Sequence, residues 1–210
     1  MKTFEIDVIS DVICPWCFLG KRRLDKAIGM LGDIKVEVSW RPFFLDPTIP
    51  SDGMSRQAYM ESKFSAERLK TIHDPLIAAG KEDGVPYNFD KITRTPNTMD
   101  AHRLLRWSHV TGQQHDMAER LFMAYWNGGL DVGSRDVLLK IAADAGMDTA
   151  DVAKKLADNT DVDAVTAEVA QAGRMGVTGV PCFILARRQG LMGAQPAEAL
   201  ATAIKSLAAA

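Results

Sequence analysis

The sequence has no marked excess of charge of either sign and no long apolar run. Its 25 Lys and Arg residues face 27 Asp and Glu residues, for a formal net charge of -2 at pH 7 with His neutral. This near balance provides no electrostatic surface for nucleic acid or for an anionic membrane. No uninterrupted apolar run approaches the roughly 20 residues of a membrane-spanning helix. We therefore expect neither a nucleic-acid partner nor a membrane partner.

Cysteine is scarce: Cys14, Cys17 and Cys182 are the three in the chain. An odd number is poorly suited to the disulfide framework of a secreted domain. The first ten residues include Glu5 and Asp7 and contain no apolar stretch of the ~7–15 residues that a secretory signal needs. A reducing cytoplasm is the simpler setting, where a disulfide is more often catalytic or transient than structural.

The first forty residues follow the pattern of a strand, a helix and a second strand. Apolar and acidic residues alternate over 4–8, which predicts a strand. Apolar residues spaced mostly three to five apart predict a helix over 15–31, which Gly32 then ends. Strict alternation over 34–40 predicts a second strand at a half-exposed edge. A unit of this kind has parallel strands and a right-handed crossover.

The rest of the chain divides into a helical middle and a short C-terminal sheet. The middle, 51–164, shows helical spacing throughout, with a further helix near 161–174. A strand over 181–186, a turn over 187–190, a short return strand and a helix opened by Pro196 follow. Neither end makes a full sheet alone. We therefore expect 1–50 and 165–210 to form one domain with 51–164 inserted.

The pair Cys14 and Cys17 stands at the predicted junction of the first strand and the first helix. Pro15 suits the first helical position, so the Cys14 sulfur would lie at the helix start, where a thiolate is favoured. Cys17, one turn later on the same face, can close a disulfide with Cys14. A zinc site needs four ligands, and only Cys182 and four scattered histidines remain. A pair of inert buried cysteines or a structural disulfide would also fit this spacing.

Three further positions near these motifs have a functional and a structural interpretation. Asp11, three residues before Cys14, would accept a proton from a dithiol, orient the loop or cap the helix region. Trp16, between the cysteines, would be a partly exposed aromatic for docking an apolar substrate, or would pack against the insertion. The Val180–Pro181 bond, after two glycines, would be cis and functionally placed, or Pro181 would simply begin a strand.

Three segments carry a resemblance to a known family. They are FEIDVISDVICPWCFLGKRRL (4–24), NTMDAHRLLRW (97–107) and GVTGVPCFIL (176–185), the last followed by GAQP (193–196). In this order they resemble the DsbA family of thioredoxin-fold proteins, most closely its FrnE-like branch, over essentially the whole chain. The resemblance implies an α/β, thioredoxin-like fold with a large all-helical insertion domain, which agrees with the pattern above.

The resemblance also implies thiol–disulfide exchange, with Cys14 as the nucleophile and Cys17 as the resolving thiol. The loop at Val180 and Pro181 would be a cis-proline loop that faces them. Asn97 and His102 match the element of the FrnE-like branch and would line the site together with Asp11, Pro15 and Trp16. Without the resemblance, Asn97 would be a helix cap and His102 an ordinary buried histidine. Cys182 fits a small buried residue better than a third redox partner.

A glutathione-linked isomerase or transferase of aromatic or polyketide-type small molecules is the alternative function. Similar folds in 2-hydroxychromene-2-carboxylate isomerases and kappa-class glutathione transferases hold glutathione on a Ser-containing loop. Met192 stands where such relatives often have Ser, which weakens a glutathione site here. We expect thiol or disulfide substrates, from proteins or glutathione, with no metal and no cofactor beyond glutathione as a candidate co-substrate. A homodimer is left open.

The residues between the cysteines predict a modest oxidant. The DsbA oxidase carries a His in this dipeptide, whereas Trp16 brings no charge. We expect the reduction potential of the Cys14–Cys17 pair to be more negative than about -120 mV, the value typical of that oxidase. Thiol alkylation in graded redox buffers measures it. A potential at or above the oxidase value would contradict this prediction.

Overall fold

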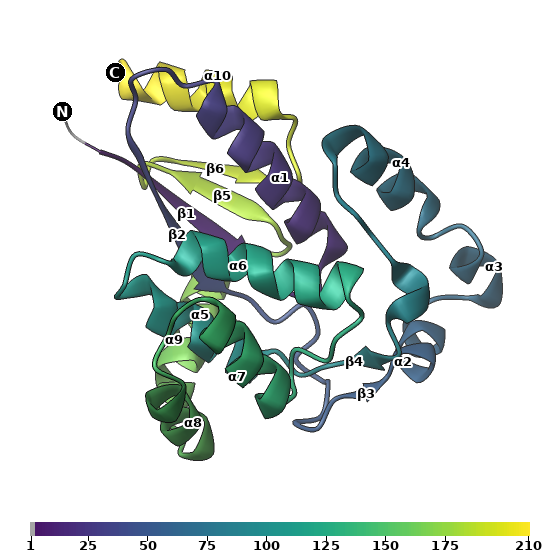
Figure 1. Ribbon diagram of the computed structural model, residues 1–210. Coiled ribbons are helices and arrows are strands. Elements are labelled where there is room, and N and C mark those ends of the chain that lie inside the picture. The colour runs from purple at the N-terminus through teal and green to yellow at the C-terminus, as the bar shows by residue number, and fades with distance from the viewer. Residues whose placement is uncertain (1–2) are drawn as a thin grey trace.

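The main sheet is built from the two ends of the chain, as the computed structural model shows for residues 3–210 (Figure 1). Its strands are β1 (Phe4–Ser10), β2 (Val36–Pro42), β5 (Cys182–Leu185) and β6 (Gln189–Met192). Their order is β2-β1-β5-β6. β1 pairs parallel with β2 and antiparallel with β5, and β5 pairs antiparallel with β6. The predicted parallel unit and the edge position of β2 are confirmed. Residues 1 and 2 of the predicted 1–50 segment lie outside the described residues.

One face of the sheet is covered by α1 (Pro15–Gly29) and α10 (Ala197–Ala208), which also pack against each other (Figure 1). The β1 residues that face α1 are almost fully buried, with Ile6 and Val8 each 1% exposed. Phe18 and Leu24 of α1 are fully buried in the same core. The alternation of β1 and the helical spacing of α1 thus meet in one apolar layer.

Several boundaries differ from the sequence-based prediction; strand β2, for example, is expected over 34–40 and spans Val36–Pro42. Helix α1 ends at Gly29, before Gly32, because Met30 N–H already bonds to Ala27 O in a tightened last turn. Strand β6 begins at Gln189, inside the expected turn, because Ala186 and Arg187 turn the chain with φ values of 49° and 56°. Pro196 has extended ψ and precedes α10 as its N-cap residue.

The middle of the chain is helical, with one exception. Its helices are α2 (Arg56–Lys63), α3 (Ala66–Leu69), α4 (Asp74–Asp83), η1 (Phe89–Lys91), α5 (Met99–His109), α6 (Gln114–Phe122), the π-helical turn η2 (Met123–Asn127), α7 (Arg135–Asp144) and α8 (Thr149–Ala157), before α9 (Val162–Arg174). The insertion is not all-helical: β3 (Met54–Ser55) and β4 (Arg94–Thr95) form a small antiparallel sheet. Strands of two residues are too short to show alternation. The predicted domain boundary falls within α9 and stays a prediction.

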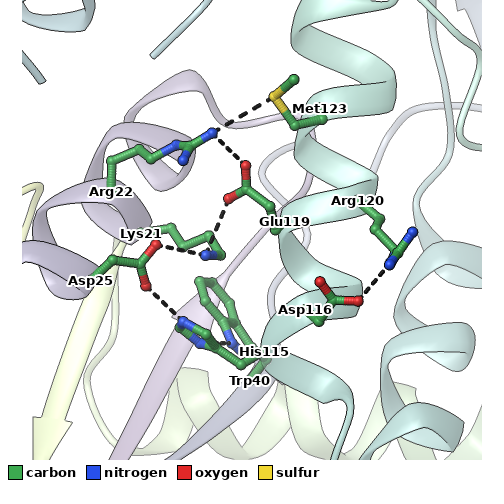
Figure 2. Close-up of polar contacts among 9 residues, drawn as sticks. All are labelled: Lys21, Arg22, Asp25, Trp40, His115, Asp116, Glu119, Arg120 and Met123. Atoms are coloured by element: carbon green, nitrogen blue, oxygen red, sulfur yellow. Dashed lines mark hydrogen bonds and ion pairs between the residues drawn. The ribbon is translucent and has the colours of Figure 1, made fainter. Parts of the chain in front are cut away.

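Charged side chains join α1 to α6 in a partly buried network (Figure 2). Lys21, 4% exposed, lies 2.8 Å from Asp25 Oδ2 and 3.1 Å from Glu119 Oε2, and Arg22 also contacts Glu119. His115 Nε2 donates to Asp25 Oδ1 over 2.6 Å. Two basic and two acidic side chains balance one another. The Lys21 ammonium therefore stays buried without an unpaired charge.

Residues of α6 also cover the outer edge of β2, which is the edge strand of the sheet. The Gln114 side chain accepts a hydrogen bond from Trp40 N and donates one to Trp40 O, over 2.8 and 3.1 Å. Trp40 Nε1 donates to His115 Nδ1 over 3.2 Å. These bonds satisfy backbone N–H and C=O groups at the sheet edge, which could otherwise pair with a strand of another chain. Within residues 3–210, no helix is both long and apolar enough to cross a lipid bilayer.

Gly20 sets how closely α1 approaches the loop before β5. A Cβ atom at Gly20 would lie 2.8 Å from Pro181 Cγ and 3.2 Å from Phe183 Cζ. Contacts this short force side chains or backbone to move. The hydrogen of Gly20 therefore lets the helix that carries the cysteines lie directly on Pro181.

We expect Gly20→Ala to lower the free energy of unfolding by about 1–3 kcal/mol through overpacking. Gly29→Ala is the matched control, because nothing lies within 4 Å of a Cβ there. That variant should leave stability unchanged or raise it by up to about 1 kcal/mol, since Ala favours the helix. Urea unfolding of both variants measures the difference. Equal effects at the two positions would contradict the role of the Pro181 contact.

Candidate active site

The two cysteines of the CPWC motif lie at the start of α1. Cys14 is the N-cap residue and Pro15 occupies the first helical position, as the sequence predicts. The Cys14 N–H bonds to Asp11 O over 3.0 Å, and the Cys17 N–H bonds to Cys14 O over 3.1 Å. Both cysteines are free thiols, 3% and 1% exposed. Trp16, between them, is 41% exposed, which agrees with the partial exposure that the sequence predicts for this side chain.

The loop before β5 lies against Cys14. The Val180–Pro181 peptide bond is cis. The Cys14 thiol donates to Val180 O over 3.7 Å, a long contact of the kind that sulfur makes. The two motifs that the sequence places more than 160 residues apart therefore meet at one point. A sulfur that attacks or leaves at Cys14 does so beside the Val180 carbonyl.

The two thiols have different surroundings. Burial, and next the Cys14 thiol, raise the pKa of Cys17 well above its usual value. The neighbouring Ser10 side chain and Asp11 backbone act in the opposite direction and lower that pKa. Burial disfavours a charged sulfur because the apolar interior solvates it poorly. In the resting dithiol, Cys17 is therefore a protonated thiol at neutral pH.

The buried side chain of Asp11 connects several segments of the chain and does not cap a helix. Its Oδ2 accepts a hydrogen bond of 2.7 Å from Leu45 N, and its side chain is 1% exposed. His102 Nε2 lies 3.1 Å from Phe43 O and 3.5 Å from Asp11 Oδ1. Asp11 and His102 thus join the segment after β2 and helix α5 to the loop that carries Cys14. The structure brings these two predicted site residues together beside the loop that precedes Cys14.

The contacts of Asn97 and Cys182 are with residues that support the fold. Asn97 Oδ1 accepts from Met99 N, and Asn97 Nδ2 donates to Ile49 O, both over 3.0 Å. These bonds hold Asn97 against the segment around Ile49 and the start of α5, whose N-cap residue is Thr98. Within residues 3–210 no hydrogen bond joins Asn97 to either cysteine of the motif. Cys182 is 2% exposed in a small apolar cluster with Ile9, and burial raises its pKa. Over the same residues, no group of three or more His, Cys, Asp or Glu residues is arranged to hold a metal ion.

Two aromatic residues of the insertion hold the dithiol loop, and the sequence analysis missed both. Tyr87 donates its hydroxyl to Pro15 O over 2.6 Å, and Trp126 donates Nε1–H to Val12 O over 2.9 Å. Their rings pack edge-to-face, 5.9 Å apart. Burial, and next the charges of Cys14 and Cys17, raise the pKa of Tyr87. No spacing in the sequence marks either residue, because their contacts are made across 72 and 114 positions.

Comparison with known proteins points to one family. The model of the DSBA-like thioredoxin domain matches residues 5–205. The uncharacterized protein YwbO of Bacillus subtilis (strain 168) is 29% identical over 191 residues, 87% of each chain. The crystal structure of a probable DsbA oxidoreductase from Streptomyces coelicolor superposes with a TM-score of 0.88 at 30% identity. It covers 98% of this chain and 90% of that chain.

A more distant structure has the same fold. A 2-hydroxychromene-2-carboxylate isomerase superposes with a TM-score of 0.76 at 17% identity, over 97% of this chain and 96% of that chain. At that identity the likeness extends to the fold alone. The thioredoxin-like fold expected from the sequence is thereby confirmed.

We expect Asp11→Ala to lower the free energy of unfolding by about 1–3 kcal/mol, because it removes the buried carboxyl group that accepts the Leu45 N–H. Asp11→Asn is the matched control, since its amide oxygen still accepts that hydrogen bond. Chemical denaturation of both variants measures the losses. If Asn costs as much as Ala, the hydrogen bond to Leu45 is not what Asp11 contributes.

Proposed function

Because the chain belongs to the family of DSBA-like thioredoxin domains, we propose that it is a thiol–disulfide oxidoreductase that acts through Cys14 and Cys17. One observation carries the proposal: two free thiols lie one helical turn apart at the start of α1, with Cys14 beside the Val180 carbonyl. Pro15 and Trp16 complete the motif between them. Helix starts favour anionic sulfur, which is the nucleophile in this chemistry.

The proposed reaction has two exchanges. The Cys14 thiolate attacks a disulfide of the substrate, one substrate sulfur leaves as a thiolate and takes a proton, and a mixed disulfide joins Cys14 to the other sulfur. Cys17 then attacks Cys14, closing the Cys14–Cys17 disulfide and releasing the second substrate thiol. The substrate disulfide gains two electrons and the dithiol loses two. A thiol such as glutathione returns the protein to its dithiol form, and the reverse sequence oxidises a substrate dithiol.

The surroundings of the two sulfurs support an order for them in this reaction. Cys14 lies at the helix start beside Trp16, whose exposed ring offers apolar area to a substrate. Cys17 is the more deeply buried of the two and is held as a thiol by its surroundings. A buried, protonated thiol is a poor nucleophile toward an external substrate. We therefore assign Cys17 to the second step, the attack on the mixed disulfide. We place the reaction in the cytoplasm, on thiols or disulfides of proteins or glutathione.

The alternative is a glutathione-linked isomerase or transferase. The fold that the chain shares with a 2-hydroxychromene-2-carboxylate isomerase is compatible with it. Such a reaction has no step for a resolving thiol, whereas this chain keeps Cys17 one helical turn after Cys14. Cys17 is therefore the residue that separates the two functions.

We expect Cys14→Ser to reduce turnover at least ~100-fold in insulin reduction or glutathione-linked disulfide reduction, because it removes the attacking sulfur. Cys17→Ser should accumulate a mixed disulfide on Cys14, visible by mass spectrometry, and lose turnover. Cys182→Ala is the matched control and should retain activity. An unaffected Cys14→Ser variant would overturn the proposal, and an active Cys17→Ser variant would favour the isomerase or transferase.

A further inference from the structure

Arg56, the first residue of α2, is a half-buried cation without a counter-charge. Within residues 3–210, the arginines that form no ion pair with a carboxylate are Arg56, Arg68, Arg174 and Arg188. The other three are exposed to solvent. The Arg56 side chain donates no hydrogen bond within the described part of the chain. Its nitrogen atoms reach the molecular surface, since none is among the buried polar atoms that lack a partner.

Two aromatic rings hold the Arg56 guanidinium in place. Its central carbon lies 6.0 Å from the ring centroid of Tyr59 and 5.8 Å from a ring centroid of Trp126. Tyr59 is 9% exposed and Trp126 is fully buried. The negative faces of such rings attract a cation and partly offset the loss of its hydration. The contact leaves the guanidinium N–H groups without an oxygen acceptor, so they stay available for an anion.

The Trp126 ring connects Arg56 to the loop that carries Cys14. Trp126 Nε1 donates to Val12 O over 2.9 Å, and Val12 lies two residues before Cys14. Two residues of chain span at most about 7 Å. The unpaired cation is therefore separated from the dithiol loop by one aromatic side chain. A small substrate whose sulfur meets Cys14 can reach Arg56 with a charged group several bonds away from that sulfur.

We propose that Arg56 binds a carboxylate of the substrate, so that the protein prefers small carboxylate-bearing disulfides, such as glutathione disulfide, to neutral ones. The proposal rests on the function proposed above. A guanidinium presents parallel N–H groups that match the two oxygens of a carboxylate. The cation is already in position and has no acidic side chain to displace. The contact comes from the insertion and does not depend on the loop at Met192. The exchange of electrons stays with Cys14 and Cys17.

The test mixes the pre-reduced protein with three disulfides: anionic glutathione disulfide, neutral hydroxyethyl disulfide and cationic cystamine. Acid quenching, thiol alkylation and mass spectrometry give the second-order rate constant of protein oxidation by each. We expect Arg56→Gln to lower the rate constant for glutathione disulfide about tenfold, the loss expected for a hydrogen bond to a charged group. The rate constant for hydroxyethyl disulfide should stay within about twofold, because a neutral substrate makes no charge-assisted bond. The rate constant for cystamine should stay the same or rise, since a like charge is removed.

Two further variants make the comparison specific. Arg56→Lys keeps the positive charge but loses the planar fork, so it should retain part of the preference for glutathione disulfide. Arg188→Gln is the matched control, because it removes the same charge from an exposed arginine that also has no carboxylate partner. Arg188 lies in the turn between β5 and β6, at the opposite end of the sheet from the loop that carries Cys14. This variant should leave all three rate constants unchanged.

The native protein provides a second measurement that does not depend on the folding of a variant. Added salt should slow its reaction with glutathione disulfide more than its reaction with hydroxyethyl disulfide, because salt screens the attraction to Arg56. An unchanged ratio of these two rate constants in Arg56→Gln, or equal slowing with both disulfides, would overturn the role of Arg56. Native rates that do not depend on substrate charge would overturn this inference alone. Failure of the native dithiol to react with any of the three disulfides would overturn the proposed function, and this inference with it.

Discussion

The contact between Gly20 and Pro181 is the constraint on which the rest of the site depends. It lets α1 lie on the loop before β5 with only a hydrogen atom between the helix backbone and the proline ring. Cys14 begins the same helix and Val180 precedes the same proline, so this spacing also sets the contact between Cys14 Sγ and Val180 O. Cys14 and Gly20 lie less than about two turns apart on this helix, so one rigid segment fixes both contacts together.

Helix α1 is fixed from two further directions, both within the insertion. On the side of α6, the Lys21 network joins it through Asp25 and Glu119 (Figure 2). Burial raises the pKa of Asp25, but hydrogen bonds from His115 and Lys21 outweigh it and keep that pKa below its usual value. On the side of α4, Asp83 accepts from Arg23 and Lys26, each over 2.7 Å. The insertion is therefore a support for the helix that carries the dithiol, in addition to covering it.

Local pattern predicted much of this architecture because the relevant signals are periodic. Alternation in β1 and β2 and helical spacing in α1 and α5 reflect which side chains one layer buries. The CPWC motif could also be identified from the sequence, because its two cysteines, Pro15 and Trp16 are contiguous. The strands β3 and β4 were not predicted from the sequence, because each has two residues and their pairing joins positions about forty residues apart.

By itself, the sequence determined the sheet unit, the helical middle and the chemistry available at CPWC, because those properties depend on neighbours along the chain. Only the tertiary structure decided what surrounds the sulfurs. Tyr87 and Trp126 reach the dithiol loop from the insertion, and the Val180 carbonyl meets the Cys14 sulfur from the loop before β5. Hydrogen-bond partners and burial depend on distances between remote segments. Periodicity specifies which faces pack, and it contains no information on which polar group meets which sulfur.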